Sequence, residues 1–361
     1  MALGREFPTR ALATSLALPC QAEHCADVRT EAALVDVLTR ARDECLPVHL
    51  LGGGSNVVAM PTVSGLTVLV RIGGVRSERS TDSTTVTVGA GENWQGLVRY
   101  CLGQGLGHLA NLSLIPGTVG GAPIQNIGAY GVEVASYIER VRVVERDSLQ
   151  TGWLSHAECG FGYRDSIFRR RPHDFAISQV QFRFPDDCPL DMSYNGIADE
   201  LGKMAVVRAK PVDVAEAVSR IRRRKLPDPR LIPNAGSFFK NPQLDQERYT
   251  QLGSQLGGIA SWSSQAAGST SAPAVTRVKL SAAALIERAI GIDRGVNNAP
   301  GVYPWRLQPL VLVHRGGCDG IEVLRVARQI ARAVKNRFAI ELEREPRIFG
   351  DQPRVEEPAG L

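Results

Sequence analysis

Hydrophobic residues recur every three or four positions in several stretches of the chain, a spacing that predicts amphipathic helices. In the stretch 30–41, for example, Leu34, Val37, Leu38 and Ala41 fall on one side of a helix. Similar spacing predicts helices at 94–102, 213–224, 279–290 and 321–338, the second of these with Asp213 as its N-cap. Helices are therefore expected along the whole chain.

Other short stretches alternate or cluster their apolar residues, as strands do. They predict strands at 47–51, 66–72, 83–89, 138–145, 150–154, 176–184, 310–313 and 338–342. The alternating runs in the middle of the chain predict a mainly antiparallel sheet. The stretch 252–274 is rich in Gly, Ser, Gln and Ala and is predicted to be a long surface loop. Strands and helices together indicate an α+β protein.

Composition narrows the class of protein. A chain of 361 residues is long for one core, so more than one domain is expected. The net charge of +5 is spread along the chain, which permits anionic ligands without requiring nucleic acid. The seven cysteines are scattered without a CxxC pair, which favours reduced thiols in the cytoplasm over disulfides or a metal site. No apolar run reaches the roughly 18 residues that span a membrane, and the N-terminus is read as the start of the first domain, not as a signal peptide.

The stretch from Ile115 to Val134 carries five glycines, several amides and no charge before Glu133. Glycine lets the backbone take positive φ and approach a ligand closely. Such a run suits a main chain that wraps around a large, partly anionic ligand and holds its phosphates with N–H groups. The alternative is a buried glycine-rich loop that only packs.

A second glycine segment, Gly52-Gly53-Gly54-Ser55-Asn56, directly follows the strand predicted at 47–51. It is not a dinucleotide fingerprint of the GxGxxG kind, because strand-like residues and not a helix follow it. Consecutive N–H groups in such a turn can still form an anion site, with Ser55 and Asn56 as further donors. A simple tight turn at the end of a strand would give the same pattern.

Two further segments carry reactive side chains. Arg164, in a polar and aromatic turn between strands, is a candidate anion clamp, although an Arg–Asp pair that ties the loop would look alike. Ser237 lies beside a glycine and two phenylalanines, as a reactive hydroxyl in an apolar pocket would, but outside the GxSxG pattern of hydrolases. The basic run Arg222 to Lys225 is interpreted as the solvated end of a helix, not as an RNA site.

Taken in order, these motifs resemble one family, the UDP-N-acetylenolpyruvoylglucosamine reductases. The motifs are GGGSN, IPGTVGGAPIQNIGAYG, YRDSIF, KLPDP, NAGSFFKNP and a glutamate after the last helix, and the resemblance covers residues 20–350. Tyr194 in MSYNGIADEL is similar to the tyrosine of the subclass that has a tyrosine loop over its substrate.

The resemblance implies a vanillyl-alcohol-oxidase-type (PCMH-type) FAD-binding domain in two subdomains, residues 1–75 and 76–220. A C-terminal α+β substrate-binding domain, residues 221–350, and a disordered tail, 351–361, would follow. FAD would contact Leu51, Gly52, Gly53, Gly54, Ser55, Asn56, Pro116, Gly117, Thr118, Gly120, Gly121, Asn126, Gly128, Ala129, Tyr130 and Gly131.

The resemblance also implies the reaction. NADPH would reduce FAD and leave, and hydride from flavin N5 would then reduce UDP-N-acetylglucosamine enolpyruvate to UDP-N-acetylmuramate for peptidoglycan synthesis. Arg164 and a late glutamate would polarise the substrate carboxylate, and Ser237 would donate the proton. Glu345 is the glutamate expected by register and Glu343 the alternative, because the usual Leu-Glu-Pro-Glu is here Leu-Glu-Arg-Glu-Pro. The substrate would also contact Tyr194, Lys225, Asn241 and Gln308. A cytoplasmic monomer without a metal is expected.

Two other functions fit parts of the pattern. One is an oxidase on the same flavin domain, in which a histidine such as His49 could tether the flavin. The other is a nucleotide-binding protein without catalysis, which would not need Arg164, Ser237 or a late glutamate.

Overall fold

The computed structural model describes residues 7–265, 276–291 and 301–352. Its first sheet has the strand order β1-β2-β5-β3, with bounds Arg10–Ala11, Gln21–Val28, Thr62–Val70 and Val48–Leu51. Strands β2 and β3 both run parallel to β5. Helix α1 (Glu31–Asp43) connects β2 to β3, and its N-cap Thr30 accepts a hydrogen bond from the N–H of Ala33 at 3.1 Å. The predicted helix at 30–41 is thus confirmed.

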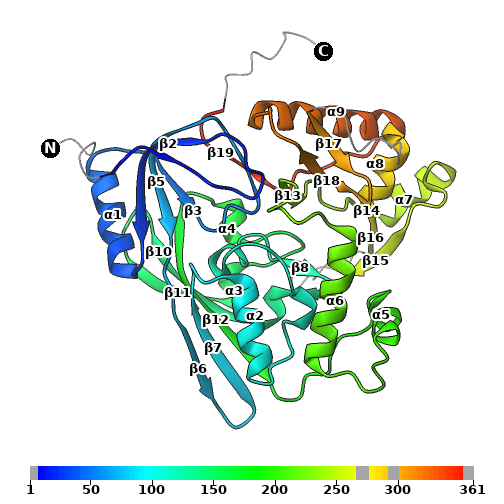
Figure 1. The fold of residues 1–361 in the computed structure, drawn as a ribbon, viewed down its shortest axis with the longest axis horizontal. Coiled ribbons are helices and arrows are strands. Elements are labelled where there is room, and N and C mark those ends of the chain that lie inside the picture. Colours follow the sequence, from blue (N-terminus) through cyan, green and yellow to red (C-terminus); the bar gives the residue numbers. More distant parts are fainter. Residues whose placement is uncertain (1–6, 266–275, 292–300, 353–361) are drawn as a thin grey trace.

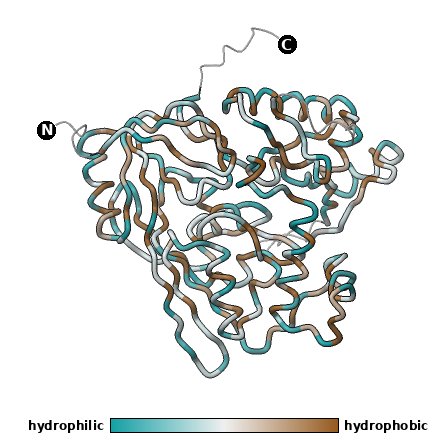
Figure 2. Tube along the Cα trace, in the orientation of Figure 1, coloured by the Kyte–Doolittle hydropathy of each residue, from teal (hydrophilic) through white to brown (hydrophobic). Residues whose placement is uncertain are grey.

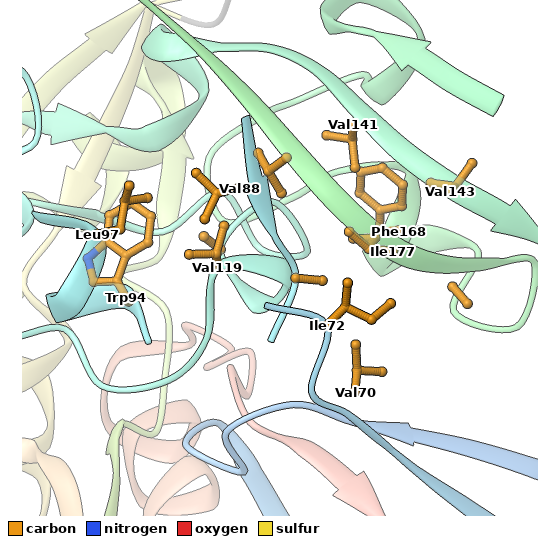
Figure 3. Packing of buried hydrophobic residues seen from close by; sticks show 14 of the residues in the cluster. Val70, Ile72, Val88, Trp94, Leu97, Val119, Val141, Val143, Phe168 and Ile177 are labelled. Carbon is orange, nitrogen blue, oxygen red and sulfur yellow. The ribbon is translucent and has the colours of Figure 1, made fainter. Parts of the chain in front are cut away.

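A second, antiparallel sheet follows, with the order β11-β10-β12-β7-β6 (Figure 1). Its strands are Thr151–Ser155, Ile138–Glu145, Phe175–Pro185, Ser83–Gly89 and Val75–Arg79. This confirms the antiparallel sheet that alternation predicted in the middle of the chain. Helix α2 (Trp94–Gly103) packs on it, and Figure 3 shows how the side chains of both sheets and α2 share one core, among them Val70, Val88, Val141, Ile177, Trp94 and Leu97.

The C-terminal part contains two smaller sheets. One has the order β13-β18-β17 (Asn234–Ser237, Gln308–His314, Val302–Trp305), and the other β14-β16-β15 (Gln243–Asp245, Thr276–Leu280, Ser261–Gln265). Helices α7 (Gln246–Leu252), α8 (Ala282–Ile290) and α9 (Gly320–Phe338) accompany them. Hydrophobic and hydrophilic residues alternate along α9 (Figure 2). The apolar side of this helix packs into the core of the C-terminal part.

Helix α6 (Pro211–Lys225) leads from the antiparallel sheet to the C-terminal part, and α5 (Ile197–Lys203) packs against it (Figure 1). Both contribute to a separate apolar cluster together with Ala110. The short elements between the sheets are the one-turn helices α3 (His156–Cys159) and α4 (Ile167–Arg170), the strand pair β8 (Gly128–Ala129) and β9 (Val132–Glu133), and several 3-10 turns. Within the described residues, no helix is long and apolar enough to cross a membrane.

Each end of the chain packs against the other part of the molecule. Leu16, Leu18, Val58 and Met60, all near the N-terminus, pack into the C-terminal core. In return, the last strand β19 (Arg347–Phe349) pairs in parallel with β4 (Val57–Ala59), so a red segment lies among blue strands in Figure 1. The three-domain division at 75/76 and 220/221 remains a prediction. Residues of the first predicted domain pack in the hydrophobic core of the third.

Several local predictions were wrong, most of them at the boundaries of helices and strands. Helix α6 begins at Pro211, so Asp213 is not the N-cap but lies in the first turn, where its carboxylate accepts from the N–H of Lys210 at 2.8 Å. The helix predicted from residue 279 begins at Ala282, because 276–280 form β16.

The predicted surface loop at 252–274 contains strand β15, which pairs with β16; residues 266–275 lie outside the described part. The strand predicted at 66–72 is longer at its start and ends at Val70. The strand predicted at 338–342 is absent from the described structure, since α9 ends at Phe338 and Ala339 caps it in a left-handed conformation. Of the predicted disordered tail, residues 353–361 lie outside the described part, while the Asp351 carboxylate accepts from the N–H and hydroxyl of Ser64 at 3.1 and 2.6 Å.

Candidate active site

A cavity of about 830 Å³ opens between the two N-terminal sheets and the C-terminal part. Both glycine segments line it, and so do Arg164, Ser237 and a short segment near the C-terminus, residues 343–347, which we call the strap. These segments are distant in sequence. The fold therefore brings most of the sequence-predicted chemistry to one place.

The two glycine segments form one continuous wall of this cavity. A side-chain carbon added at Gly53 would lie 2.8 Å from the Cα of Gly117, closer than real contacts allow, so the two backbones touch. Ser55 donates to the carbonyl of Pro116 at 3.1 Å, and Asn56 donates to the side-chain oxygen of Gln125 at 2.7 Å. Strand β4, not a helix, follows the first segment, as its sequence indicated.

Backbone N–H groups in this wall are free to bind a ligand. Within the described part of the chain, the N–H groups of Gly53, Gly54, Ser55, Gly117 and Thr118 have no hydrogen-bond partner. Buried or half-buried N–H groups normally find an acceptor. Several unpaired N–H groups that face one cavity are therefore suited to the oxygens of a phosphorylated ligand.

The cavity is lined by most, but not all, of the residues predicted to bind the cofactor. Leu51 to Asn56, Pro116, Gly117, Thr118, Gly120, Gly121 and Gly128 line it, whereas Asn126, Ala129, Tyr130 and Gly131 do not. Asn126 instead connects segments: its amide donates to Glu133 at 2.8 Å and to the carbonyl of Gly162 at 3.0 Å. It thereby holds the central glycine stretch against the turn that carries Arg164.

Arg164 lies in a turn between Gly162 and Asp165, with an unusual positive φ of 51°. Its guanidinium donates to the carbonyls of Asn126 at 3.2 Å and Gly128 at 2.5 Å. The Arg–Asp pair that ties this loop is made by Arg170 with Asp165, not by Arg164. Arg164 is thus held by backbone and keeps its Nε directed at the strap.

The strap presents its two glutamates differently. Glu345 is 8% exposed, and its Oε1 lies 3.6 Å from Nε of Arg164. Burial raises the pKa of Glu345 above its ordinary value, against the lowering effects of Arg164, Arg169 and Lys240. The side chain of Glu343 is 63% exposed and pairs with Lys240 at 2.5 Å. Glu345 therefore has the environment of a carboxyl that binds its proton more tightly than an exposed one does.

Ser237 ends strand β13 and lines the cavity, as the glycine segments do. Asn234 shapes this end, because its side-chain oxygen accepts from the N–H of Gly236 at 3.0 Å, where φ is +71°. The Ser237 hydroxyl makes no hydrogen bond within the described structure. It is therefore available to a ligand in the cavity.

The residues predicted to bind the substrate lie away from the cavity wall. Tyr194 is 41% exposed, with its ring edge-on to Tyr130 at 5.0 Å. Lys225 is exposed at the end of α6, Asn241 accepts from the N–H of Ala282 at 3.0 Å, and Gln308 begins β18. None of these four residues lines the cavity.

Sequence reasoning missed most of the cationic lining. Arg146, Arg169, Arg222, Arg344 and Arg347 line the cavity beside Arg164. Burial lowers the pKa of Arg222, and it has no ion-pair partner in the described part of the chain. The prediction of a solvated helix end was therefore wrong for Arg222, although Arg223, Arg224 and Lys225 are exposed. A basic run by itself does not show which member faces inward.

Comparison with known proteins identifies proteins that are similar to this chain. A family model described as "FAD binding domain" matches residues 22–150, and one for the C-terminal domain of UDP-N-acetylenolpyruvoylglucosamine reductase matches residues 228–349. The UDP-N-acetylenolpyruvoylglucosamine reductase of Ralstonia nicotianae is 42% identical over 333 residues, which cover 91% of this chain and 94% of that protein. That of Xanthomonas campestris pv. campestris is 40% identical over 96% of both chains.

The chain belongs to the UDP-N-acetylenolpyruvoylglucosamine reductase family. Among solved structures, the reductase of Thermus caldophilus has the same fold, with a TM-score of 0.60 and 21% identity over 95% of this chain and 99% of that one. The predicted fold class, an α+β protein with a FAD-binding domain of the vanillyl-alcohol-oxidase type and a C-terminal α+β domain, is confirmed.

This member of the reductase family is an oxidoreductase whose cofactor is FAD. Its cavity fits the group: free N–H groups and a cation-rich lining suit the diphosphate, and close glycine contacts leave the wall without side chains. Gly52 to Ser55 and Gly117 to Thr118 would hold the phosphates, as donors in an anion site do.

Proposed function

We propose that this chain reduces UDP-N-acetylglucosamine enolpyruvate to UDP-N-acetylmuramate, with NADPH as the electron donor, in peptidoglycan precursor synthesis. The observation that supports the proposal is the convergence of Arg164, Glu345 and Ser237 on the cavity that the two glycine segments line. A nucleotide-binding protein without catalysis would not need these three side chains in one cavity. NADPH and the sugar nucleotide would use this cavity in turn.

FAD, when bound, supplies hydride transfer from NADPH to the terminal carbon of the enolpyruvyl group. The carbon beside the substrate carboxylate then carries negative charge, which is costly unless it spreads onto the carboxylate oxygens. Overall, one hydride and one proton add across the carbon–carbon double bond, while NADPH becomes NADP⁺. The protein must therefore stabilise the carboxylate and provide the proton.

Arg164 and Glu345 are placed for the first task. Arg164 is held by two backbone carbonyls, so its cation is fixed before the substrate arrives. Burial raises the pKa of Glu345, which favours the protonated carboxyl, and in that form it can donate a hydrogen bond to a carboxylate oxygen. Together they form a site for developing negative charge that needs no rearrangement.

Ser237 is assigned the second task. Its hydroxyl lies on the cavity wall without a partner in the described structure and can donate its proton to the carbon that bears the charge. A serine hydroxyl is a weak acid, so this role depends on the basicity of the developing enolate and on a fixed position. The β13 end and the Gly236 turn provide that position.

Tyr194, Lys225, Asn241 and Gln308 are proposed to contact the sugar nucleotide from around the cavity. Because they do not line the cavity, they suit the outer parts of a large substrate more than the reacting carbons. The scattered free cysteines support a cytoplasmic location. A monomer is proposed as well.

The proposal is tested by visible spectra of the purified protein under anaerobic conditions. NADPH is expected to bleach the flavin bands, and the enolpyruvyl sugar nucleotide to restore them. Bleaching without recovery would contradict the substrate, and a protein that takes up no added FAD would contradict the whole proposal.

An oxidase with a tethered flavin is the second candidate. His49 lines the cavity edge-on to Phe349, with ring centroids 5.8 Å apart. Acid precipitation separates the two functions, because a tethered flavin stays with the precipitate. We expect the flavin to remain in the supernatant.

A further inference from the structure

The strap and helix α4 are joined by two arginines in opposite directions. Arg169, on α4, donates to the carbonyl of Glu345 at 3.1 Å and to that of Arg344 at 3.0 Å. Arg347, on the strap side, donates to the carbonyls of Phe168 at 2.9 Å and Arg169 at 3.2 Å. Each arginine binds the backbone of the segment that carries the other. Such a reciprocal pair fixes both the distance and the orientation of the two segments.

Helix α4 directly follows the turn of Arg164, and its Phe168 is buried in the main core against Phe175, with ring centroids 6.0 Å apart. The strap, by contrast, has no helix or strand of its own before Arg347. Arg169 therefore links the strap to a helix that is anchored in the main core. Its side chain is 16% exposed, so water competes little for these bonds.

On its other side the strap is bound to the segment of Ser237. The N–H of Glu345 donates to the carbonyl of Phe238 at 2.9 Å, and the N–H of Lys240 donates to the carbonyl of Glu343 at 2.8 Å. The strap thus lies between the segment that carries Arg164 and the segment that carries Ser237. In the described structure, side chains link the strap to the Arg164 segment through the Arg164–Glu345 contact and through the interactions of Arg169 and Arg347.

We propose that Arg169 is a positioning residue, which holds the carbonyls of Arg344 and Glu345 so that the Glu345 carboxyl stays beside Arg164. The proposal rests on the function proposed for Glu345. A lysine could not replace this arginine fully, because its single ammonium cannot reproduce the planar fork that binds two carbonyls at once. A small displacement of a positioned group can cost up to about 100-fold in rate.

Arg169 also contributes charge. The titratable groups that face Glu345 include Arg164, Arg169, Lys240, Glu343 and Tyr163; the three cations lower the pKa of Glu345 and Glu343 raises it. Loss of the Arg169 charge should therefore raise the pKa of Glu345 further. If Glu345 acts in its protonated form, turnover falls as pH rises through this pKa, and that fall should move to higher pH.

Two variants separate position from charge: Arg169→Gln removes both the fork and the charge, and Arg169→Lys removes only the fork. Arg171→Gln is the control, since Arg171 belongs to the same basic run but pairs with Asp174, with its side chain 59% exposed. All three are measured as FAD-loaded protein. Stopped-flow spectra follow bleaching by NADPH and recovery with the enolpyruvyl sugar nucleotide, and hydrogen exchange follows the amides of Glu345 and Arg347.

Both Arg169 variants should recover about 10–100-fold more slowly while bleaching normally, with faster exchange at the strap amides. Only Arg169→Gln should move the fall of turnover to higher pH, and Arg171→Gln should match the natural protein. If Arg169→Gln fails to hold FAD, Arg169→Lys must still show slow recovery and fast exchange. Native recovery and native exchange in Arg169→Lys would overturn the proposal. Native recovery in Glu345→Gln would instead overturn the role of Glu345, so the two failures are distinguishable.

Discussion

Nε of Arg164 lies 3.6 Å from Oε1 of Glu345, although one residue follows the central glycine stretch and the other comes after the last helix. Their side chains are 18% and 10% exposed. The cation is bound to backbone carbonyls and the pKa of the carboxyl is raised, so a fixed cation lies beside an acid that binds its proton more tightly than usual. This arrangement can accept a substrate carboxylate between a fixed charge and a hydrogen-bond donor.

Replacing Arg164 by lysine should slow recovery of the flavin bands with the enolpyruvyl sugar nucleotide about 100–1,000-fold, the usual cost of one lost stabilising donor. Lysine keeps the charge but cannot hold the carbonyls of Asn126 and Gly128 together. Stopped-flow spectra after reduction with NADPH measure this step. Unchanged recovery would show that the pair does not act on the substrate.

Ser237→Ala should leave bleaching by NADPH intact and slow recovery about 100–10,000-fold, the range of general acid catalysis. The hydroxyl faces the cavity, while the fold of β13 depends on its backbone and not on this side chain. Both half-reactions are measured separately on one preparation. Equal slowing of both would indicate damage to the cavity and not the loss of a proton donor.

Substitutions of the two glutamates of the strap should affect turnover differently. Glu345→Gln should slow recovery far more than Glu343→Gln, because Glu345 is buried beside Arg164 and Glu343 is exposed. Steady-state turnover of the two variants at one pH is sufficient to compare them. A larger loss in Glu343→Gln would reverse the assignment of the late glutamate.

The stability of the folded protein should depend on pH through the carboxyl of Glu345. Because burial raises the pKa of Glu345 above its ordinary value of 4.5, the folded protein binds this proton more tightly than the unfolded chain does. Its contribution to stability is fully present below pH 4.5 and is lost as pH rises through the raised pKa. Urea unfolding should therefore show a smaller fall in stability with pH in Glu345→Gln, by up to ~1.4 kcal/mol per pH unit in that window. Parallel curves for both proteins would contradict this.

The contact between the glycine segments predicts the effect of one added carbon. Gly53→Ala would place a methyl group 2.8 Å from the Cα of Gly117, so the two segments must separate. Overpacking of this kind costs about 1–3 kcal/mol, and we expect FAD to bind more weakly. Quenching of FAD fluorescence on titration measures the affinity. Gly103→Ala is the control, because nothing lies near the added carbon there.

Local sequence was sufficient for many elements and for the kind of chemistry. Periodicity in residues 30–41 and 321–338 reports which face of a helix is buried, and both helices are present. The glycine segments, Arg164 and Ser237 were recognisable because free N–H groups, a cation and a hydroxyl are rare in such apolar surroundings. Where neighbouring residues competed for a strand or a helix, as at 276–282, periodicity alone placed the boundary wrongly.

Only the tertiary structure decided which of these groups meet. Glu343 and Glu345 are two residues apart and both line the cavity, but the fold, with β19 paired to β4 and the strap bound by Arg169, buries the side chain of Glu345 beside Arg164 and leaves that of Glu343 exposed. Likewise Arg222 could be told from Arg223 only by what α6 packs against. Whether a side chain is buried depends on segments that are far apart in the chain. Burial in turn sets the pKa of a carboxyl and decides whether a cation needs a partner. A local sequence pattern does not show which distant segments will cover a residue.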